Sequence, residues 1–130
     1  MNWIQDAVAE YGRQLGIEGL RLDANGAVQL QLQSGGLLAV EQTRRGEIDE
    51  VLVYLGSPLG FEGPRRLRAA LARAHYSNGT GQAVQVACRG EGPEALLLVI
   101  VRLPERDFTL QSLGQAFDFL SRWLENLPAR

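Results

Sequence analysis

The sequence has no lysine, a single cysteine (Cys88) and a single histidine (His75) among its 130 residues. Without lysine it can form no Schiff base with a substrate and has no phosphate-loop lysine. One cysteine excludes an internal disulfide and any multi-cysteine metal site, and it favours a reducing compartment. We therefore expect a protein that is not an enzyme, has no catalytic or metal-binding residues and uses no cofactor.

Long apolar runs are also missing. The longest, residues 95–101, is far shorter than the ~18 residues that cross a bilayer, so we expect no membrane insertion. The first six residues have neither the basic flank nor the apolar core of a signal peptide. The formal net charge of -2 lacks the basic excess of most nucleic-acid-binding proteins. With 45% apolar and 22% charged residues, the chain is expected to fold as one cytoplasmic domain over residues 1–130.

Four local patterns resemble functional motifs, and each has a simpler interpretation. Ser57 lies among glycines but lacks the spacing of a nucleophile elbow. Cys88 ends an alternating segment and is expected to be a buried structural residue. The acidic segment 47–50, which follows a pair of arginines, is expected to be a solvated turn rather than an acid–base pair. The arginines of residues 65–73 are expected on the wet face of a helix.

Apolar periodicity predicts three helices and several strands. Residues repeating at helical spacing indicate the helices, and strict alternation with polar residues indicates the strands. Turn sequences such as Asn25-Gly26 separate the first strands, which favours antiparallel hairpins. The predicted order is helix 2–16, a short edge strand 20–22, strands 28–32, 37–41 and 48–55, helix 64–77, strands 82–88 and 95–103, and helix 109–127.

This order predicts an α+β domain with a twisted antiparallel sheet. The strand 95–103 is apolar on both faces, whereas a sheet with one wet face has alternating strands. The last helix is also apolar well beyond one stripe. Surplus apolar surface on a small domain indicates a partner subunit or a protein ligand.

Several segments together resemble a known family, the class I type III secretion chaperones. The resemblance to the family begins with Leu15-Gly16-Ile17 and Leu20 to Gly26, and it continues at Val101-Arg102-Leu103-Pro104. It is nearest to the SycN-type branch. The segments that carry this second resemblance are Met1-Asn2-Trp3-Ile4, Gln33-Ser34-Gly35-Gly36-Leu37 running into Glu41-Gln42, Phe108-Thr109-Leu110, Leu113 and Gln115-Ala116-Phe117. The resemblance implies the element order α-β-β-β-α-β-β-α, to which the edge strand 20–22 would be an addition.

The resemblance also implies a function. SycN-type proteins are cytoplasmic chaperones, peripheral to the secretion apparatus, that do not hydrolyse ATP. They pair with a second small chaperone of the YscB type, and the heterodimer binds the N-terminal segment of a YopN-type gatekeeper that regulates secretion. An alternative is a homodimeric class I chaperone for another secreted effector. A small enzyme or a nucleic-acid-binding regulator is the remaining alternative, and the composition counts against both.

Two sets of site residues follow from the resemblance. In class I chaperones the second helix and a neighbouring strand usually make the subunit contact, which here implies Leu67, Leu71, Ala74, Val84 and Val86. Apolar patches on the first helix and the sheet receive the client, by strand addition and pockets for alternate side chains. The expected client-binding residues, each of which has a place in the core as its alternative, are Trp3, Leu37, Ala39, Leu52 and Tyr54.

Overall fold

The computed structural model describes residues 3–77 and 82–127. The elements follow the order α-β-β-β-α-β-β-α, which confirms the predicted fold class. Short 3₁₀ turns, η1 and η2, flank β5. The bounds are α1 Trp3–Gln14, β1 Ala27–Gln31, β2 Leu37–Arg45, β3 Ile48–Pro58, α2 Gly63–Ser77, β4 Gln85–Arg89, η1 Gly92–Glu94, β5 Leu96–Pro104, η2 Glu105–Asp107 and α3 Leu110–Glu125.

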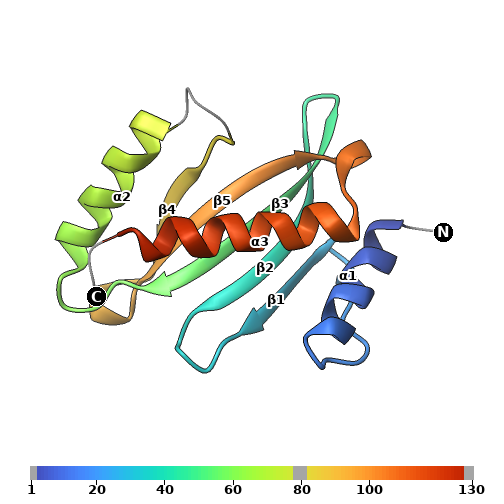
Figure 1. Ribbon diagram of the computed structural model, residues 1–130, viewed down its shortest axis with the longest axis horizontal. Helices are drawn as coiled ribbons and strands as arrows, with labels where there is room; N and C mark the ends of the chain where they lie inside the picture. The colour runs from blue at the N-terminus through green and yellow to red at the C-terminus, as the bar shows by residue number, and fades with distance from the viewer. Residues whose placement is uncertain (1–2, 78–81, 128–130) are drawn as a thin grey trace.

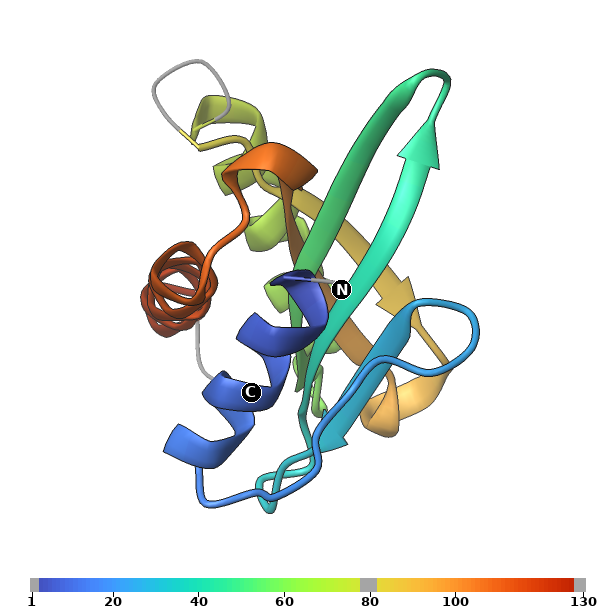
Figure 2. The same ribbon diagram turned by 90° about the vertical axis from the view of Figure 1, so that its right-hand side faces the viewer.

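The five strands form one antiparallel sheet in the order β1-β2-β3-β5-β4. β1 and β4 are therefore the two edges, and β5 lies between β3 and β4. Helix α3 crosses β3 and β5, α1 packs beside α3, and α2 contacts β4 (Figure 1). Figure 2 shows that all three helices lie on the same side of the sheet.

The main core lies between the sheet and these helices. Alternation places Val51 and Val53 on the helix-facing side of β3, where both are fully buried. Ile4 of α1 and Leu113 of α3 are fully buried in the same core cluster as these valines. Helix α3 begins at a capping box in which Thr109 and Ser112 satisfy each other's backbone N–H groups.

The predicted edge strand 20–22 is wrong: among the described residues, this segment is a loop that packs against α1. Leu22 is buried, and its backbone N–H donates to the Gln5 side chain at 2.7 Å. Leu20 packs over Gly12, and any side chain on residue 12 would clash with it. The predicted turn at Gly26 does form, with a left-handed φ of 79°, but it leads from this loop into β1.

Candidate functional site

The sheet face opposite the helices carries a second apolar cluster. Leu37, Ala39, Tyr54 and Leu98 are its buried members, and Leu52, Ala87, Leu96 and Ile100 are its half-buried ones. The register explains the grouping, because Ala39, Tyr54 and Ile100 lie opposite one another on adjacent strands. No helix of the described residues covers this outer-face cluster (Figure 2).

Four of the five residues expected to bind the client lie together in the outer-face cluster: Leu37, Ala39, Leu52 and Tyr54. The Tyr54 hydroxyl accepts a hydrogen bond from Gln29 at 3.3 Å and donates to Glu41 at 3.5 Å, which fixes the ring across the sheet. Sequence reasoning did not name Leu98 and Ile100. The signal was present, since the strand that contains them is apolar on both faces.

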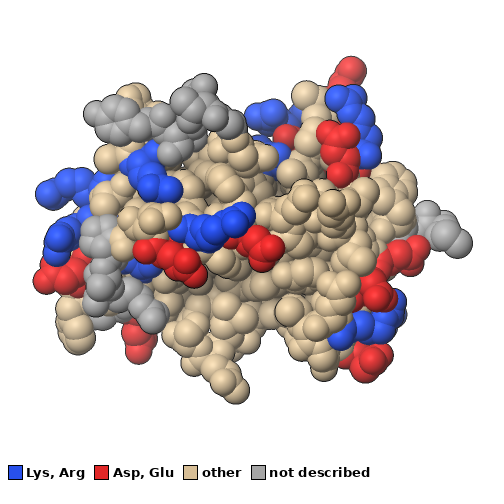
Figure 3. All heavy atoms as spheres, in the orientation of Figure 1, with Lys and Arg blue, Asp and Glu red and all other residues tan. Residues whose placement is uncertain are grey.

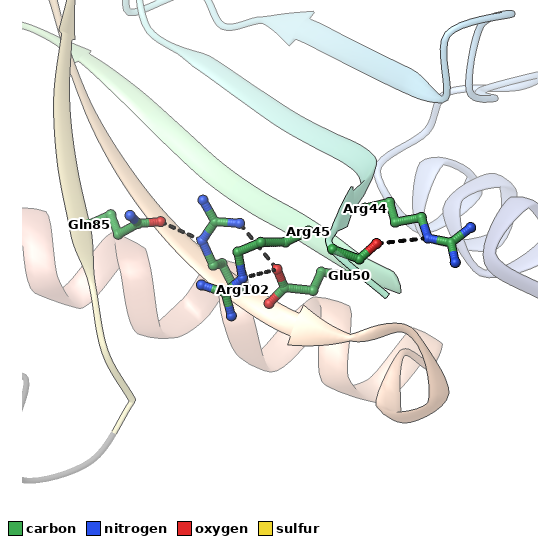
Figure 4. A network of polar contacts seen from close by, with 6 residues as sticks. Arg44, Arg45, Glu50, Gln85 and Arg102 are labelled. Carbon is green, nitrogen blue, oxygen red and sulfur yellow. Dashed lines mark hydrogen bonds and ion pairs between the residues drawn. The ribbon is translucent and has the colours of Figure 1, made fainter. Parts of the chain in front are cut away.

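A buried carboxylate borders this cluster (Figure 4). Glu50 is only 5% exposed and lies 3.2 Å from Arg102 and 3.4 Å from Arg45. Arg102 also donates to Gln85 at 2.6 Å, so the network joins four strands of the sheet. The expectation that segment 47–50 is a solvated turn is therefore wrong for Glu50, because its position on the outer face brings it beside the arginines of β2 and β5.

Trp3, the fifth expected client-binding residue, lies apart from the cluster. Its side chain is 51% exposed at the start of α1. It lines a hollow of about 610 Å³ with Ile48 and Pro104, between the β2–β3 turn and η2. The structure thus separates Trp3 from the other four residues.

The residues expected at the subunit contact are unequally accessible. Leu71 on α2 is 52% exposed, whereas Leu67 and Val86 are half-buried. Ala74 and Val84 are buried within this chain, so their side chains have almost no surface left for a partner. The expected contact residues of α2 do not form one surface, because Ala74 faces the core together with Ala70 whereas Leu71 is exposed.

The arginines of α2 also depart from expectation. Arg66 is 5% exposed, not on the wet face, and its guanidinium donates to Ser57 Oγ at 2.9 Å and to the Pro58 carbonyl at 3.0 Å. Arg73 lies with its guanidinium 5.3 Å from the ring centre of Trp123 on α3. These two arginines hold α2 against β3 and α3, which leaves the opposite side of the helix exposed.

An exposed phenylalanine beside α2 was not expected. Phe61, in the loop before the helix, is 91% exposed. It stands at the rim of an apolar hollow of about 410 Å³, whose apolar lining comes from Leu59, Phe61, Pro64, Leu67, Cys88 and Ala95. Cys88 is exposed, so the expectation of a buried cysteine is wrong. The reason is that Cys88 lies near the end of the edge strand β4, where it lines this open hollow and is not covered by the packed helices.

The described residues hold no cluster of three or more histidine, cysteine, aspartate or glutamate side chains placed to bind a metal ion. None of the helices in residues 3–77 and 82–127 has the length and apolarity to cross a membrane. Among the described residues of the helix-bearing face, basic and acidic side chains are interspersed (Figure 3).

Comparison with known proteins gives one matching family and several solved structures with the same fold. The family model described as "Type III secretory system chaperone SycN" matches residues 3–127. A chain of the ExsC-ExsE complex is similar in structure, with a TM-score of 0.67, 15% identity and coverage of 99% of this chain and 98% of that chain. A search of curated proteins gave no match.

Two further solved structures have the same fold. A chain of the Yersinia pestis type III secretion chaperone SycH in complex with a fragment of YscM2 has a TM-score of 0.64 at 13% identity, and the match covers 96% of this chain and 99% of that chain. A chain of the HopA1-SchA chaperone-effector complex has a TM-score of 0.66 at 14% identity, covering 95% and 91%. At these identities the likeness shows the fold.

Proposed function

Because this chain belongs to the type III secretory system chaperone SycN family, we propose that it pairs with a second small chaperone of the YscB type and binds the N-terminal segment of a YopN-type gatekeeper. It acts by binding alone, in the cytoplasm, and keeps the gatekeeper competent for secretion. The similar folds support a binding role, since each comes from a complex of two different proteins, two of which are described as chaperone complexes.

The observation that carries the proposal is the outer-face cluster. A small domain that places eight apolar residues on a sheet face without a covering helix has surface to offer a protein ligand. An extended segment laid across this face gains pockets for alternate apolar side chains beside Leu52 and Ile100, both half-buried. Ordering such a segment costs conformational entropy, so the contact must bury on the order of 1,000 Å² or more.

The second subunit is assigned to the other exposed apolar surface, on α2. Leu71 is the most exposed of the predicted contact residues there, and Leu67 lies one turn before it. This surface and the outer-face cluster lie on different sides of the sheet. A chaperone pair can therefore form on α2 while the client remains on the sheet.

Native mass spectrometry of complexes isolated from the host at moderate salt is the direct test. The proposal expects a mass that fits one copy of this chain, one different small subunit and one gatekeeper. A complex of two identical chains with one effector would instead establish the homodimeric chaperone.

Three leucine-to-arginine variants then separate the two surfaces. Leu52→Arg is expected to lose the gatekeeper and keep the second chaperone, and Leu71→Arg is expected to lose the second chaperone. Leu15→Arg is the matched control, because Leu15 is 48% exposed at the end of α1 and belongs to neither surface. If all three variants retain both partners, the assignment of the surfaces is wrong.

A further inference from the structure

The outer-face cluster borders a row of side chains that carry opposite charges at its two ends. In the register of the sheet, Glu41 on β2, Leu52 on β3 and Arg102 on β5 lie opposite one another, so their side chains leave the same face. Neighbouring strands are about 4.8 Å apart, which places Glu41 and Arg102 roughly 10 Å apart with Leu52 between them. The row therefore has a negative end, an apolar centre and a positive end.

The positive end has more basic than acidic groups (Figure 4). Arg102 and Arg45 lie 3.2 and 3.4 Å from the same oxygen, Glu50 Oε1, and their side chains remain 32% and 64% exposed. Arg102 also donates to the neutral Gln85, and its guanidinium has more N–H donors than these two contacts use. One carboxylate thus serves two cations, and one positive charge is left for a further anion.

The negative end has no cation. Glu41 is half-buried and accepts a hydrogen bond from the Tyr54 hydroxyl at 3.5 Å. None of the ion pairs within residues 3–77 and 82–127 includes Glu41. A half-buried carboxylate loses part of its hydration, and a cation carried by a ligand would compensate that loss with a charge-assisted hydrogen bond.

We propose that Glu41 and Arg102 select the client segment by its charge pattern, with a basic side chain over β2, an apolar side chain on Leu52 and an acidic side chain over β5. The inference rests on the proposed function, in which an extended client segment lies across this face. Residues four apart in an extended segment lie on one face about 13 Å apart, and long charged side chains cover the difference from the spacing of the row. The matching segment therefore has a basic, an apolar and an acidic residue at alternate positions.

The two charges and the apolar cluster have different tasks. The apolar cluster offers contact area to any segment with alternating apolar side chains, so it discriminates little between them. A segment with two charges of the same sign would bring like charges together at one end of the row, which is unfavourable. Selection against such segments is the contribution that we assign to Glu41 and Arg102.

The test measures the binding of capped synthetic peptides to the purified full-length chain by isothermal titration calorimetry. In the matched peptide, lysine, leucine and glutamate alternate with serine between flanking valines. Control peptides have glutamine in place of the lysine, glutamine in place of the glutamate, or glutamate in place of the lysine. Each glutamine peptide is expected to bind about 5-fold more weakly than the matched one, and the like-charged peptide more weakly still. High salt is expected to reduce these differences by screening the charges.

Neutral variants of the chain assign each preference to its residue. Arg102→Gln is expected to bind the matched peptide and the peptide without glutamate equally, and Glu41→Gln the matched peptide and the peptide without lysine equally. Glu47→Gln, at an exposed position of the β2–β3 turn, is expected to keep both preferences. Each comparison is a ratio of two peptides on one variant, so a general change in stability cancels.

The outcomes separate this inference from the proposed function. Equal binding of all peptides to the parent chain overturns the charge selection, as do preferences that survive both neutral variants. If Leu52→Arg then abolishes the binding of every peptide, the outer face still stands as the client surface. If no peptide binds, or if Leu52→Arg binds them all as the parent does, the outer face is not the client surface and both proposals fail.

Discussion

Two glycine-to-alanine substitutions in helices should change stability in opposite directions. Helix propensity alone predicts that each stabilises the chain by up to about 1 kcal/mol, because alanine loses less backbone entropy on folding. Gly114 in α3 should behave this way, since a Cβ there would lie 3.9 Å from the Tyr11 ring, an ordinary contact. Gly114→Ala is therefore expected to raise the free energy of unfolding by about 0.5–1 kcal/mol.

Gly12 in α1 has no such space. A Cβ at this position would lie 2.7 Å from Leu20 Cβ, 3.0 Å from Leu20 Cδ2 and 3.2 Å from the Ile17 carbonyl oxygen. Two of these atoms are fixed to the loop backbone, so the loop must move. Overpacking of this kind costs about 1–3 kcal/mol, which outweighs the gain in propensity. Gly12→Ala should thus lower the free energy of unfolding by about 1–2 kcal/mol.

Urea denaturation followed by circular dichroism measures both variants against the parent chain. The midpoints should move in opposite directions while the slope m stays constant, which shows that stability and not compactness has changed. If Gly12→Ala proves as stable as Gly114→Ala, loop 17–22 does not pack on α1 as described, and the account of the missing edge strand fails with it.

The remaining predictions concern a buried ion pair, a raised pKa and a close approach of strands. Glu50→Ala should lower the free energy of unfolding, measured by urea denaturation, by about 1–2 kcal/mol. This is less than for a fully buried ion pair, because the two arginine partners are 64% and 32% exposed. Glu47→Ala, at an exposed position, is the control, and equal effects of the two substitutions would contradict the role of the pair. Burial, and secondarily the charge of Asp118, raises the pKa of Tyr11 above 10.0. The neutral phenol is thereby favoured in the folded chain, so this contribution to stability is complete below about pH 10 and is lost as the pH rises through the raised pKa. Tyr11→Phe should flatten that decline in unfolding free energies measured between pH 9 and 11.5, and an unchanged pH profile would refute the assignment. Gly56→Ala would place a Cβ 2.9 Å from Leu98 and 3.0 Å from Leu37, both in the outer-face cluster. The substitution should therefore lower the melting temperature and weaken binding of the gatekeeper. Undiminished binding would show that this part of the cluster does not contact the client.

Periodicity predicted the parts of the fold in which one face is buried and the other wet. The alternation of Val51 and Val53 fixed the inner side of β3, because a shift of one residue would turn these side chains to the other face. The same alternation at Leu20 and Leu22 led to the wrong prediction of an edge strand. Two leucines spaced by one residue pack equally well on a helix, and the space for Leu20 is set by Gly12, a contact that the strand pattern does not contain.

The site residues in alternating strands were predicted from the sequence, whereas those whose exposure depends on long-range packing were not. Leu37 and Tyr54 lie in alternating strands, so their common face followed once the strands were correct. Phe61 is a lone aromatic in a glycine-rich loop, and no period points to it. Cys88 was misjudged because its exposure depends on β4 being an edge, and strand order arises from long-range pairing that local pattern does not specify.

The position of β5 in the sheet has a consequence for synthesis of the chain. β1, β2 and β3 pair with their neighbours in sequence, so this meander can assemble early. The other side of β3 pairs with β5, which follows α2 and β4 along the chain. Until β5 has left the ribosome, a long apolar strand keeps an open edge, the kind of surface that recruits wrong partners. Closure of this central pair, with its high contact order, should therefore be the slow step of folding and the stage most exposed to aggregation.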